Sequence, residues 1–226
     1  MNIEKYKSLI PQNIYDELIR LNLSVLRPSQ IKSINKGIFE GKNLLVCTPT
    51  ASGKTLVGEL AMLNLLLNNN EDGKFKAVYV VPLKALANEK FRQFTKRYTQ
   101  FKTALTSGDM DSDDRYLINY DIIITTSEKL DSLTRHHCPW LKDIRVLIVD
   151  EIHLLTDTTR GPTLEILITL LRNELKGLQL IGLSATIGNA KELAKWLKAE
   201  LIEDSWRPVR LDQGVIVNDT IYFQEK

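Results

Sequence analysis

The sequence contains little cysteine, with only Cys47 and Cys138 among its 226 residues. Two cysteines provide neither a disulfide framework nor a zinc-ligand pattern, so we expect buried or unreactive thiols in a reducing compartment. Long apolar runs are also missing, because segments such as residues 60–67 (LAMLNLLL) are far shorter than the roughly 18 to 20 residues that span a bilayer. The first residues lack a basic region followed by an apolar core, which excludes a signal peptide. These absences predict a cytoplasmic protein.

A strong charge of either sign is absent as well. The formal net charge is +2, charged residues make up 26% and hydrophobic residues 43%. These values are ordinary for a globular fold, and the length suits one large domain or one domain with appendages. The charge is too small to indicate a nucleic-acid partner by composition, so such a partner must be argued from local motifs.

Short runs of branched apolar residues alternate with segments of helical periodicity. The runs cover residues 44–47, 77–81, 121–125, 145–149 and 178–183. The helical segments follow Lys54 and cover residues 83–98, 163–176 and 189–200. Near-continuous apolar runs suit strands buried on both faces. The alternation predicts an α/β fold with a mostly parallel central sheet and helices on both faces. Ligands of such folds bind at the carboxyl ends of the strands.

The stretch TPTASGKT, residues 48–55, follows the first run and precedes an apolar helical pattern. This strand–loop–helix context is what a phosphate-binding loop requires, although Thr48 stands where glycine is expected. Backbone N–H groups would hold the β-phosphate, Lys54 would reach the β- and γ-phosphates, and Thr55 would bind Mg²⁺. A glycine turn that opens a helix is the alternative. The expected nucleotide-binding residues are Thr48, Pro49, Thr50, Ala51, Ser52, Gly53, Lys54 and Thr55.

The tetrapeptide DEIH follows the run at residues 145–149. An acidic residue at the end of a buried strand is costly unless a cation lies near it. Asp150 is placed to hold Mg²⁺ through water, and Glu151 to orient and deprotonate an attacking water. An acidic helix start is the alternative. Alongside a phosphate loop on the same sheet, the tetrapeptide predicts catalytic roles for Glu151, Asp150 and Lys54.

DEIH and TPTASGKT together resemble the motifs of superfamily 2 helicases of the DExH type, whose motors are paired RecA-like domains. The resemblance implies a RecA-like P-loop NTPase fold that takes ATP and Mg²⁺. LRPSQ, residues 26–30, is similar to the family's adenine-reading segment, so Gln30 would hydrogen-bond adenine with Arg27 beside it. The same segment also suits a helix that begins with Pro28 in its first turn. Both interpretations are compatible.

The tripeptide Ser184-Ala185-Thr186 follows the last run and is similar to the family motif that couples hydrolysis to strand movement. The resemblance implies coupling roles for His153, Ser184 and Thr186, with the hydroxyl groups close enough to reach His153.

Three further segments follow predicted strands and would lie on the opposite lip of the sheet. Small hydroxyl residues and exposed N–H groups there can hold sugar-phosphate oxygens without reading sequence. The alternatives are a capping box at residues 125–128 and an ordinary turn at Gly108. The basic helix at residues 90–98 is expected to be a solvated face outside this groove. The candidate nucleic-acid-binding residues are Pro82, Lys84, Ser107, Gly108, Thr126, Ser127 and Glu128.

Residues 108–136, 160–165 and 206–215 resemble more narrowly the archaeal DNA helicases of the Hjm type, relatives of the eukaryotic polymerase-theta helicase domain. The resemblance implies ATP-dependent unwinding with 3′ to 5′ movement on single-stranded or branched DNA, in fork repair or recombination. It divides the chain into a helical lead-in (1–25), a RecA-like motor domain (26–203) and the start of a crossover (204–226).

Two departures from the family pattern qualify this resemblance. Ala51 stands where glycine is common, so its backbone must find an acceptable φ. No segment resembles the arginine motif of a second RecA-like domain, so we expect a fragment that is nearly inactive alone and that works with a second RecA-like domain and accessory domains. The strand-like ending at residues 219–226 has no evident partner.

Alternative functions remain open at this point. The motifs would bind phosphates and so do not distinguish DNA from RNA. An RNA helicase motor therefore remains an alternative. A nucleotide-dependent nucleic-acid-binding or scaffold module without motor activity is the alternative from another class. A small-molecule kinase is disfavoured, because DEIH, SAT and LRPSQ would then all be coincidences.

Overall fold

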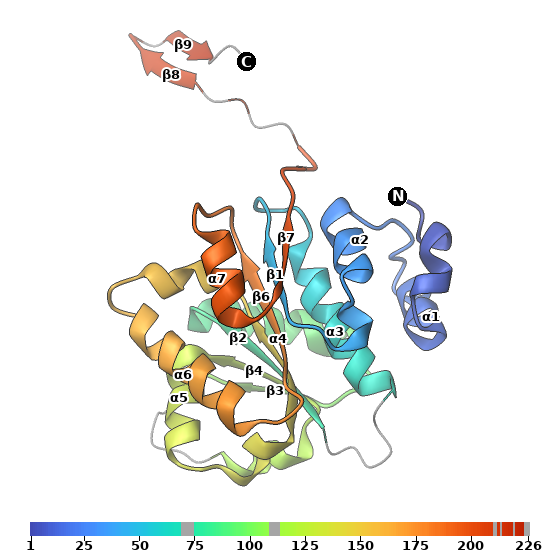
Figure 1. Cartoon of the computed structure of the whole chain (residues 1–226), viewed down its shortest axis with the longest axis vertical. Coiled ribbons are helices and arrows are strands. Elements are labelled where there is room, and N and C mark those ends of the chain that lie inside the picture. Colours follow the sequence, from blue (N-terminus) through green and yellow to red (C-terminus); the bar gives the residue numbers. More distant parts are fainter. Residues whose placement is uncertain (69–74, 109–113, 210–211, 213, 219, 224–226) are drawn as a thin grey trace.

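A computed structural model describes residues 1–68, 75–108, 114–209, 212, 214–218 and 220–223. A seven-stranded sheet forms its centre, in the order β3-β4-β2-β5-β6-β1-β7 (Figure 1). Every pairing in this sheet is parallel, which confirms the predicted α/β class. The strands are β1 Leu44–Cys47, β2 Lys76–Val81, β3 Thr103–Thr106, β4 Ile122–Thr126, β5 Ile144–Val149, β6 Gln179–Ser184 and β7 Glu200–Glu203.

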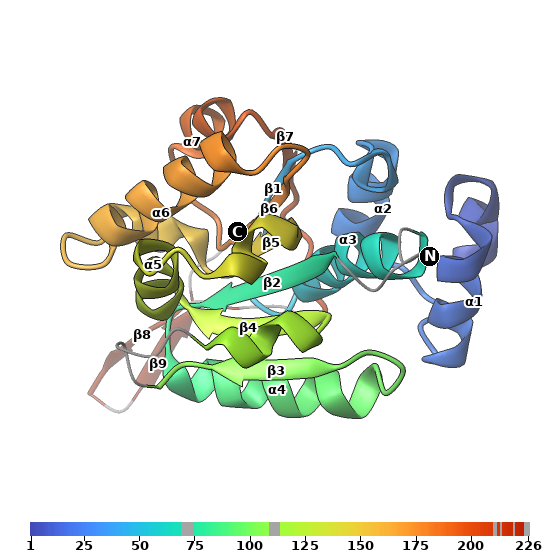
Figure 2. The same ribbon diagram turned by 90° about the horizontal axis from the view of Figure 1, so that it is seen from below.

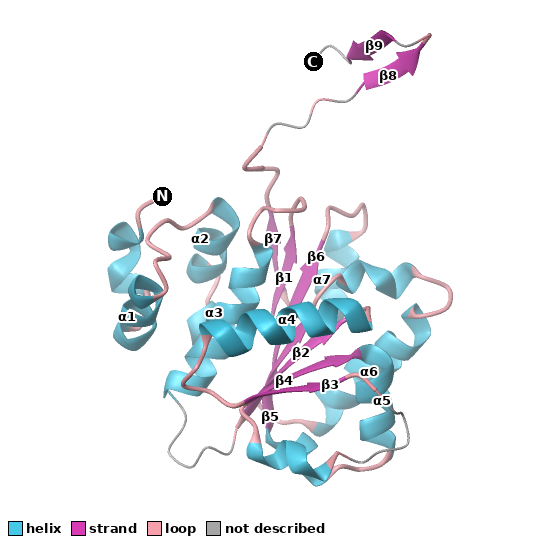
Figure 3. Ribbon diagram, turned by 180° about the vertical axis from the view of Figure 1, so that it is seen from behind, coloured by secondary structure: helices cyan, strands magenta, loops and turns pink. Residues whose placement is uncertain are grey.

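Helices cover both faces of the sheet, as expected for strands that are apolar on both sides (Figures 1 and 3). One face carries α2 (Pro28–Asn35), α3 (Lys54–Asn68) and α4 (Lys84–Arg97). The other carries α5 (Ser127–Arg135), α6 (Gly161–Glu174) and α7 (Ala190–Leu197). Successive strand residues alternate between the two cores.

The N-terminal segment lies outside α3 (Figure 2). It consists of a 3-10 helix, η1 (Ile3–Leu9), and α1 (Gln12–Arg20), whose Ile14 and Leu18 are fully buried against the core. Four more 3-10 helices connect the larger elements: η2 Ile38–Glu40, η3 Arg115–Asn119, η4 Pro139–Asp143 and η5 Ile152–Thr156.

Two predictions at the C-terminal end were wrong. The helix expected to reach residue 200 ends at Leu197, because Lys198 adopts a left-handed φ of 51° and Glu200 already begins β7. The ending that had no evident partner forms β9 (Thr220–Phe223), which pairs antiparallel with β8 (Gly214–Val217). Asn218, at φ 46°, suits the tight turn of such a hairpin. The hairpin stands away from the body (Figure 1).

The parallel register gathers the carboxyl ends of the strands at one edge. Cys47 of β1 lies opposite Ser184 of β6, and Val149 of β5 lies opposite Val80 of β2. The strand order therefore places the ends of β5, β6 and β1 in one half of the edge and those of β2, β4 and β3 in the other. Every motif singled out in the sequence after a strand falls at this edge.

Both cysteines are buried and free, as the sequence predicted. Burial raises the pKa of Cys47 to about 11, which keeps the thiol protonated at neutral pH. Among the described helices, none is both long and apolar enough to cross a membrane.

Gly161 offers a test of how η5, which begins with the last two residues of DEIH, is held against α6. A Cβ at this position would lie 2.3 Å from the carbonyl oxygen of Leu155, a backbone atom that has little room to move. We expect Gly161→Ala to lower the free energy of unfolding by about 3 kcal/mol in urea titrations, through overpacking. Gly188→Ala is the matched control, since nothing lies within 4 Å of its Cβ position. Equal stabilities of the two variants would contradict the close approach.

Candidate functional site

The loop between β1 and α3 is closed by its own side chains. The hydroxyl groups of Thr48 and Ser52 are buried and hydrogen-bonded to each other at 2.7 Å. The backbone N–H of Thr48 donates to the carbonyl of Ser184 on β6 at 3.2 Å. Thr48, which stands where glycine was expected, therefore ties the base of the loop together and leaves its outer backbone for a ligand.

Two residues of this loop have left-handed backbones: Ala51 at φ 63° and Gly53 at φ 90°. For an L-residue such as Ala51 this conformation costs roughly 1–2 kcal/mol. The carbonyl oxygen of Ala51 accepts a hydrogen bond from Nη1 of Arg27 at 2.5 Å. Arg27 therefore helps hold the loop in its curved form.

Gln30 links the start of α2 to the same loop. Its Oε1 accepts from the backbone N–H of Arg27 at 2.8 Å, and its Nε2 donates to the carbonyl of Gly53 at 2.9 Å. One Nε2 hydrogen and one Oε1 lone pair remain for a ligand. Pro28 opens the helix, so the helix-start interpretation is confirmed, while the amide keeps the capacity to bind a base.

A cleft of about 320 Å³ adjoins this amide. It is lined by the starts of α2 and α3 and by Lys90, Gln93 and Arg97 of α4. Most polar side chains of residues 90–98 are exposed, as expected for a solvated face, and three of them, Lys90, Gln93 and Arg97, also border this cleft in the nucleotide half of the edge. Helical periodicity distinguishes a polar face from an apolar one, but it does not show which cleft the polar face borders.

The floor of the cleft holds a buried carboxylate that the sequence analysis missed. Glu59 of α3 is 2% exposed, and its Oε2 accepts from Arg97 at 2.6 Å and from the Tyr98 hydroxyl. The available signal was one acidic residue in the otherwise apolar segment that follows the phosphate loop.

Asp150 leaves the end of β5 with its carboxylate fixed in place. Oδ1 accepts from the backbone N–H of Glu151 at 3.0 Å, and Oδ2 accepts from the hydroxyl of Tyr79 at 2.8 Å. Tyr79 lies on the neighbouring strand β2 and is fully buried. Sequence reasoning missed this tyrosine, because the order of the strands along the chain does not show which strand pairs with β5 in the sheet.

Lys54 and Glu151 meet across the edge of the sheet. Lys54 Nζ lies 3.4 Å from Glu151 Oε2, and the lysine side chain is 10% exposed. Glu151 has a left-handed backbone, with φ 51°. Strained backbones of this kind gather at functional sites. The structure thus brings together the ammonium group and the carboxylate that the sequence assigned to phosphate binding and to water activation.

The residues with predicted coupling roles, His153, Ser184 and Thr186, are less closely connected with one another than Lys54 is with Glu151. His153 Nδ1 lies 3.3 Å from Glu151 Oε2. His153 Nδ1 and Ser184 Oγ are both buried without a hydrogen-bond partner among the described residues, so the expected contact between the serine and the histidine is absent from this structure. His153 faces Glu151 from η5, whereas Ser184 ends a buried strand. Thr186 is exposed.

The candidate nucleic-acid-binding residues lie at the ends of β2, β3 and β4. Lys84 and Gly108 are exposed, whereas Pro82, Ser107 and Glu128 are half-buried. Thr126 and Ser127 are buried. Asp109, the next residue of the segment after β3, lies outside the described residues.

The capping box predicted for residues 125–128 is replaced by a simple N-cap one residue later, where the N3 residue is Lys129 and has no carboxylate to complete a box. Thr126 is the N-cap of α5, and its hydroxyl accepts from the backbone N–H of Lys129 at 3.4 Å. β4 runs to Thr126, so the last residue of the strand is also the cap of the helix. The buried Lys129 also lies 3.3 Å from Asp114, which accepts a hydrogen bond from Thr106 of β3. This buried ion pair, missed in the sequence, joins the ends of β3 and β4.

Two oxygen groups are available for Mg²⁺: the Thr55 hydroxyl and the Asp150 carboxylate. No group of three or more His, Cys, Asp or Glu side chains gathers as a metal site within the described residues. A few protein oxygens suit Mg²⁺, which keeps several waters and binds substrate phosphates. Tyr79 lies beside this pair, since its hydroxyl donates to Asp150 Oδ2 at 2.8 Å. These residues fit the ion.

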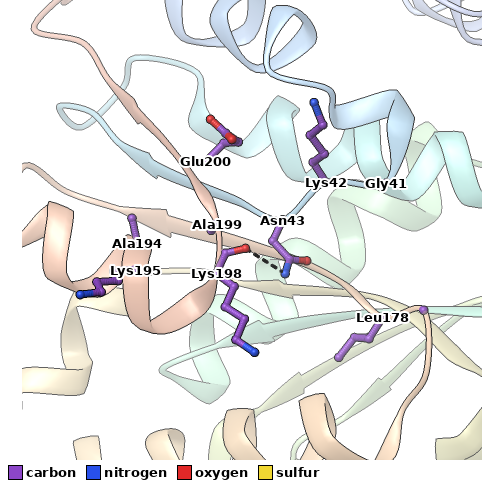
Figure 4. Close-up of a pocket in the computed structure, with 10 residues that line it drawn as sticks. Gly41, Lys42, Asn43, Leu178, Ala194, Lys195, Lys198, Ala199 and Glu200 are labelled. Carbon is purple, nitrogen blue, oxygen red and sulfur yellow. Dashed lines mark hydrogen bonds between the residues drawn. The ribbon is translucent and has the colours of Figure 1, made fainter.

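A larger hollow, of about 480 Å³, lies at the opposite edge of the sheet, beside the starts of β1, β6 and β7. Its lysines, Lys42, Lys195 and Lys198, point in different directions (Figure 4). Asn43 spans part of it by donating to the carbonyl of Lys198 at 3.4 Å. Since its charged groups diverge, this hollow has no arrangement that would hold one ligand.

Comparison with known proteins gives consistent matches. The family model described as DEAD/DEAH box helicase matches residues 27–193. The chain is 52% identical over 202 residues to the ATP-dependent DNA helicase Hel308 of Methanocaldococcus jannaschii, covering 88% of this chain and 17% of that protein. It is 48% identical over 227 residues to Hel308 of Pyrococcus horikoshii, covering 100% of this chain and 30% of that protein.

The chain therefore spans between 17% and 30% of the length of these curated relatives. Among solved structures, it is similar to the DUF1998 helicase MrfA bound to DNA, with a TM-score of 0.71 and 24% sequence identity. That match covers 87% of this chain and 30% of MrfA. At this identity the likeness shows the fold alone.

The left-handed backbone of Ala51 predicts an unusual effect of glycine. We expect Ala51→Gly to raise the free energy of unfolding by about 0.5 kcal/mol, because relief of backbone strain outweighs the extra entropy of glycine in the unfolded chain. Denaturant titration measures the effect.

Ala85→Gly, on the exposed part of α4, is the matched control and should lower stability by about 1 kcal/mol. A loss of stability at position 51 equal to that at position 85 would contradict the left-handed conformation.

Proposed function

Because this chain belongs to the DEAD/DEAH box helicase family, we propose that it is the first motor domain of an ATP-dependent 3′ to 5′ DNA helicase in fork repair or recombination. The contact between Lys54 and Glu151 carries the proposal, since it joins the phosphate loop of β1 to the acidic motif of β5. The proposed division is a helical lead-in at residues 1–25, a motor domain at 26–203 and the start of a crossover at 204–226.

The chemistry proposed for this site is hydrolysis of the γ-phosphate by water. Phosphates entering the loop attract Lys54, which exchanges its contact with Glu151 for phosphate oxygens. The released Glu151 carboxylate then orients the attacking water and accepts its proton. Mg²⁺ bound by Thr55 and Asp150 supplies charge neutralisation at the β- and γ-phosphates. Arg27 and the backbone of residues 49–53 keep the loop in its binding form, and Gln30 takes the adenine.

The described site contains one side of a phosphoryl-transfer centre. Gln30 lies in α2, Lys54 at the start of α3 and Glu151 just after β5, all on the same edge of one domain, and a cleft adjoins Gln30. Arginines that complete such sites contribute roughly 10³ to 10⁵ in rate. We propose that a second RecA-like domain of the full-length protein supplies them, so that this chain alone binds nucleotide and hydrolyses it very slowly.

The DNA strand is proposed to lie over the ends of β2, β4 and β3. Lys84 is exposed at the first turn of α4, where an ammonium group and free N–H groups can meet phosphate oxygens. This half adjoins the catalytic half directly, because the backbone N–H of Asp150 donates to the carbonyl of Val80 at 2.8 Å. Movement of β2 would therefore shift the backbone of Asp150.

Replacement of Glu151 tests the motor against a module that only binds nucleotide. In the full-length protein, we expect Glu151→Gln to lower DNA-stimulated ATP turnover by roughly 10² to 10⁴, the scale of a lost general base, with ATP affinity within about threefold of wild type.

Glu165→Gln, at an exposed position of α6, is the matched control and should leave both quantities unchanged. Turnover by Glu151→Gln equal to that of the control would refute the assignment of the base.

The nucleic-acid class is tested by stimulation of the full-length ATPase. We expect single-stranded DNA to stimulate turnover at least tenfold more than single-stranded RNA of the same sequence and length. A protein contact to the 2′-hydroxyl of RNA would instead make RNA the stronger stimulator. Equal or greater stimulation by RNA would replace the DNA helicase with an RNA helicase.

A further inference from the structure

A buried tyrosine outside the motifs singled out in the sequence touches the proposed metal site. Tyr79 is fully buried on β2, and its ring packs edge to face against Phe94 of α4, with ring centroids 5.4 Å apart. Its hydroxyl donates to Asp150 Oδ2 at 2.8 Å. The hydroxyl is the donor in this hydrogen bond, and the carboxylate is the acceptor.

This hydrogen bond fixes which way the Asp150 carboxylate turns. Oδ1 is already held by the backbone N–H of Glu151, so a donor on Oδ2 leaves one rotational setting of the group. Partners of this kind orient metal ligands and tune their affinity, and their loss typically costs about 10- to 100-fold in metal binding.

The ammonium group of Lys90 also lies near Tyr79. Lys90 Nζ lies 5.7 Å from the centroid of the Tyr79 ring and 3.5 Å from the hydroxyl oxygen of Thr55. The ammonium group therefore occupies a lone pair of the second proposed metal ligand. A positive charge at this distance opposes a divalent cation, so Lys90 must withdraw when the metal enters.

We propose that Tyr79 and Lys90 set the Mg²⁺ affinity of the site in opposite directions: Tyr79 positions Asp150 for the metal, and Lys90 competes with the metal for Thr55. The inference rests on the proposed function, since it assumes that Thr55 and Asp150 bind the ion that accompanies a nucleotide. Lys90 and the exposed Lys84 share α4, so the metal site and the proposed DNA-binding edge are joined by one rigid helix.

The test measures the affinity of the chain for a fluorescent ADP analogue as Mg²⁺ is added, and again in EDTA. For Tyr79→Phe we expect the Mg²⁺ concentration at half-saturation to rise about tenfold or more, with affinity in EDTA within about twofold of wild type. The split between these two readouts separates loss of metal positioning from general damage to the nucleotide site.

Tyr98→Phe is the matched control. Tyr98 is also fully buried, belongs to the same aromatic stack through Phe94, and donates its hydroxyl to a carboxylate, that of Glu59. Removal of this hydroxyl should lower stability to a similar extent and leave the Mg²⁺ half-saturation unchanged. Equal half-saturation concentrations in Tyr79→Phe and Tyr98→Phe would overturn the role of Tyr79.

Lys90→Met supplies a second variant that leaves the buried tyrosine in place and keeps an apolar stem over its ring. It should lower the Mg²⁺ half-saturation about threefold, opposite in sign to Tyr79→Phe, because a competing charge is removed. An unchanged or higher value would overturn the competition. If the wild-type chain bound no nucleotide with Mg²⁺ present, the proposed function would fail. Wild-type binding without these shifts refutes the inference alone.

Discussion

All seven strands of the central sheet run parallel, and the rest of the molecule follows from that constraint. A parallel sheet covered by helices on both faces ends all its strands at one edge, where the apolar runs stop and polar backbone begins. Residues distant in the sequence, such as Lys54 and Glu151, meet there because their strands lie two positions apart. The residues proposed for catalysis therefore need no long loop to meet.

Polar groups at the edge are expensive to bury, and most of those at the site are stabilised by a partner in the same loop or on another element. Thr48 is paired with Ser52, Gln30 with Gly53, Asp150 with Tyr79 and Lys54 with Glu151. These contacts hold donors and acceptors in place before a ligand arrives, so binding costs little reorganisation. Ser184 Oγ and His153 Nδ1 are the exception, since both are buried and make no hydrogen bond within the described part of the chain, and both belong to residues with predicted coupling roles.

The sequence predicted the sheet, most helix limits and the position of every motif at the strand ends, because these depend on local periodicity and turn residues. It also identified Ala51 as a residue under backbone constraint, and its φ is left-handed. Tyr79, Lys90 and Glu59 were missed for one reason: their roles arise from which strand and helix lie beside one another. β7 was missed because only Ile202 in its four residues is buried, too short a pattern to detect.

We propose that the edge formed by β1, β5 and β6 is half of an ATPase centre. The decisive test is a crystal structure of the chain grown with Mg²⁺ and a non-hydrolysable ATP analogue. We expect phosphates against residues 49–55, the base in the cleft beside Gln30, and the ion between Thr55 and Asp150. A nucleotide bound away from this loop, or an ion that touches neither Thr55 nor Asp150, would contradict it.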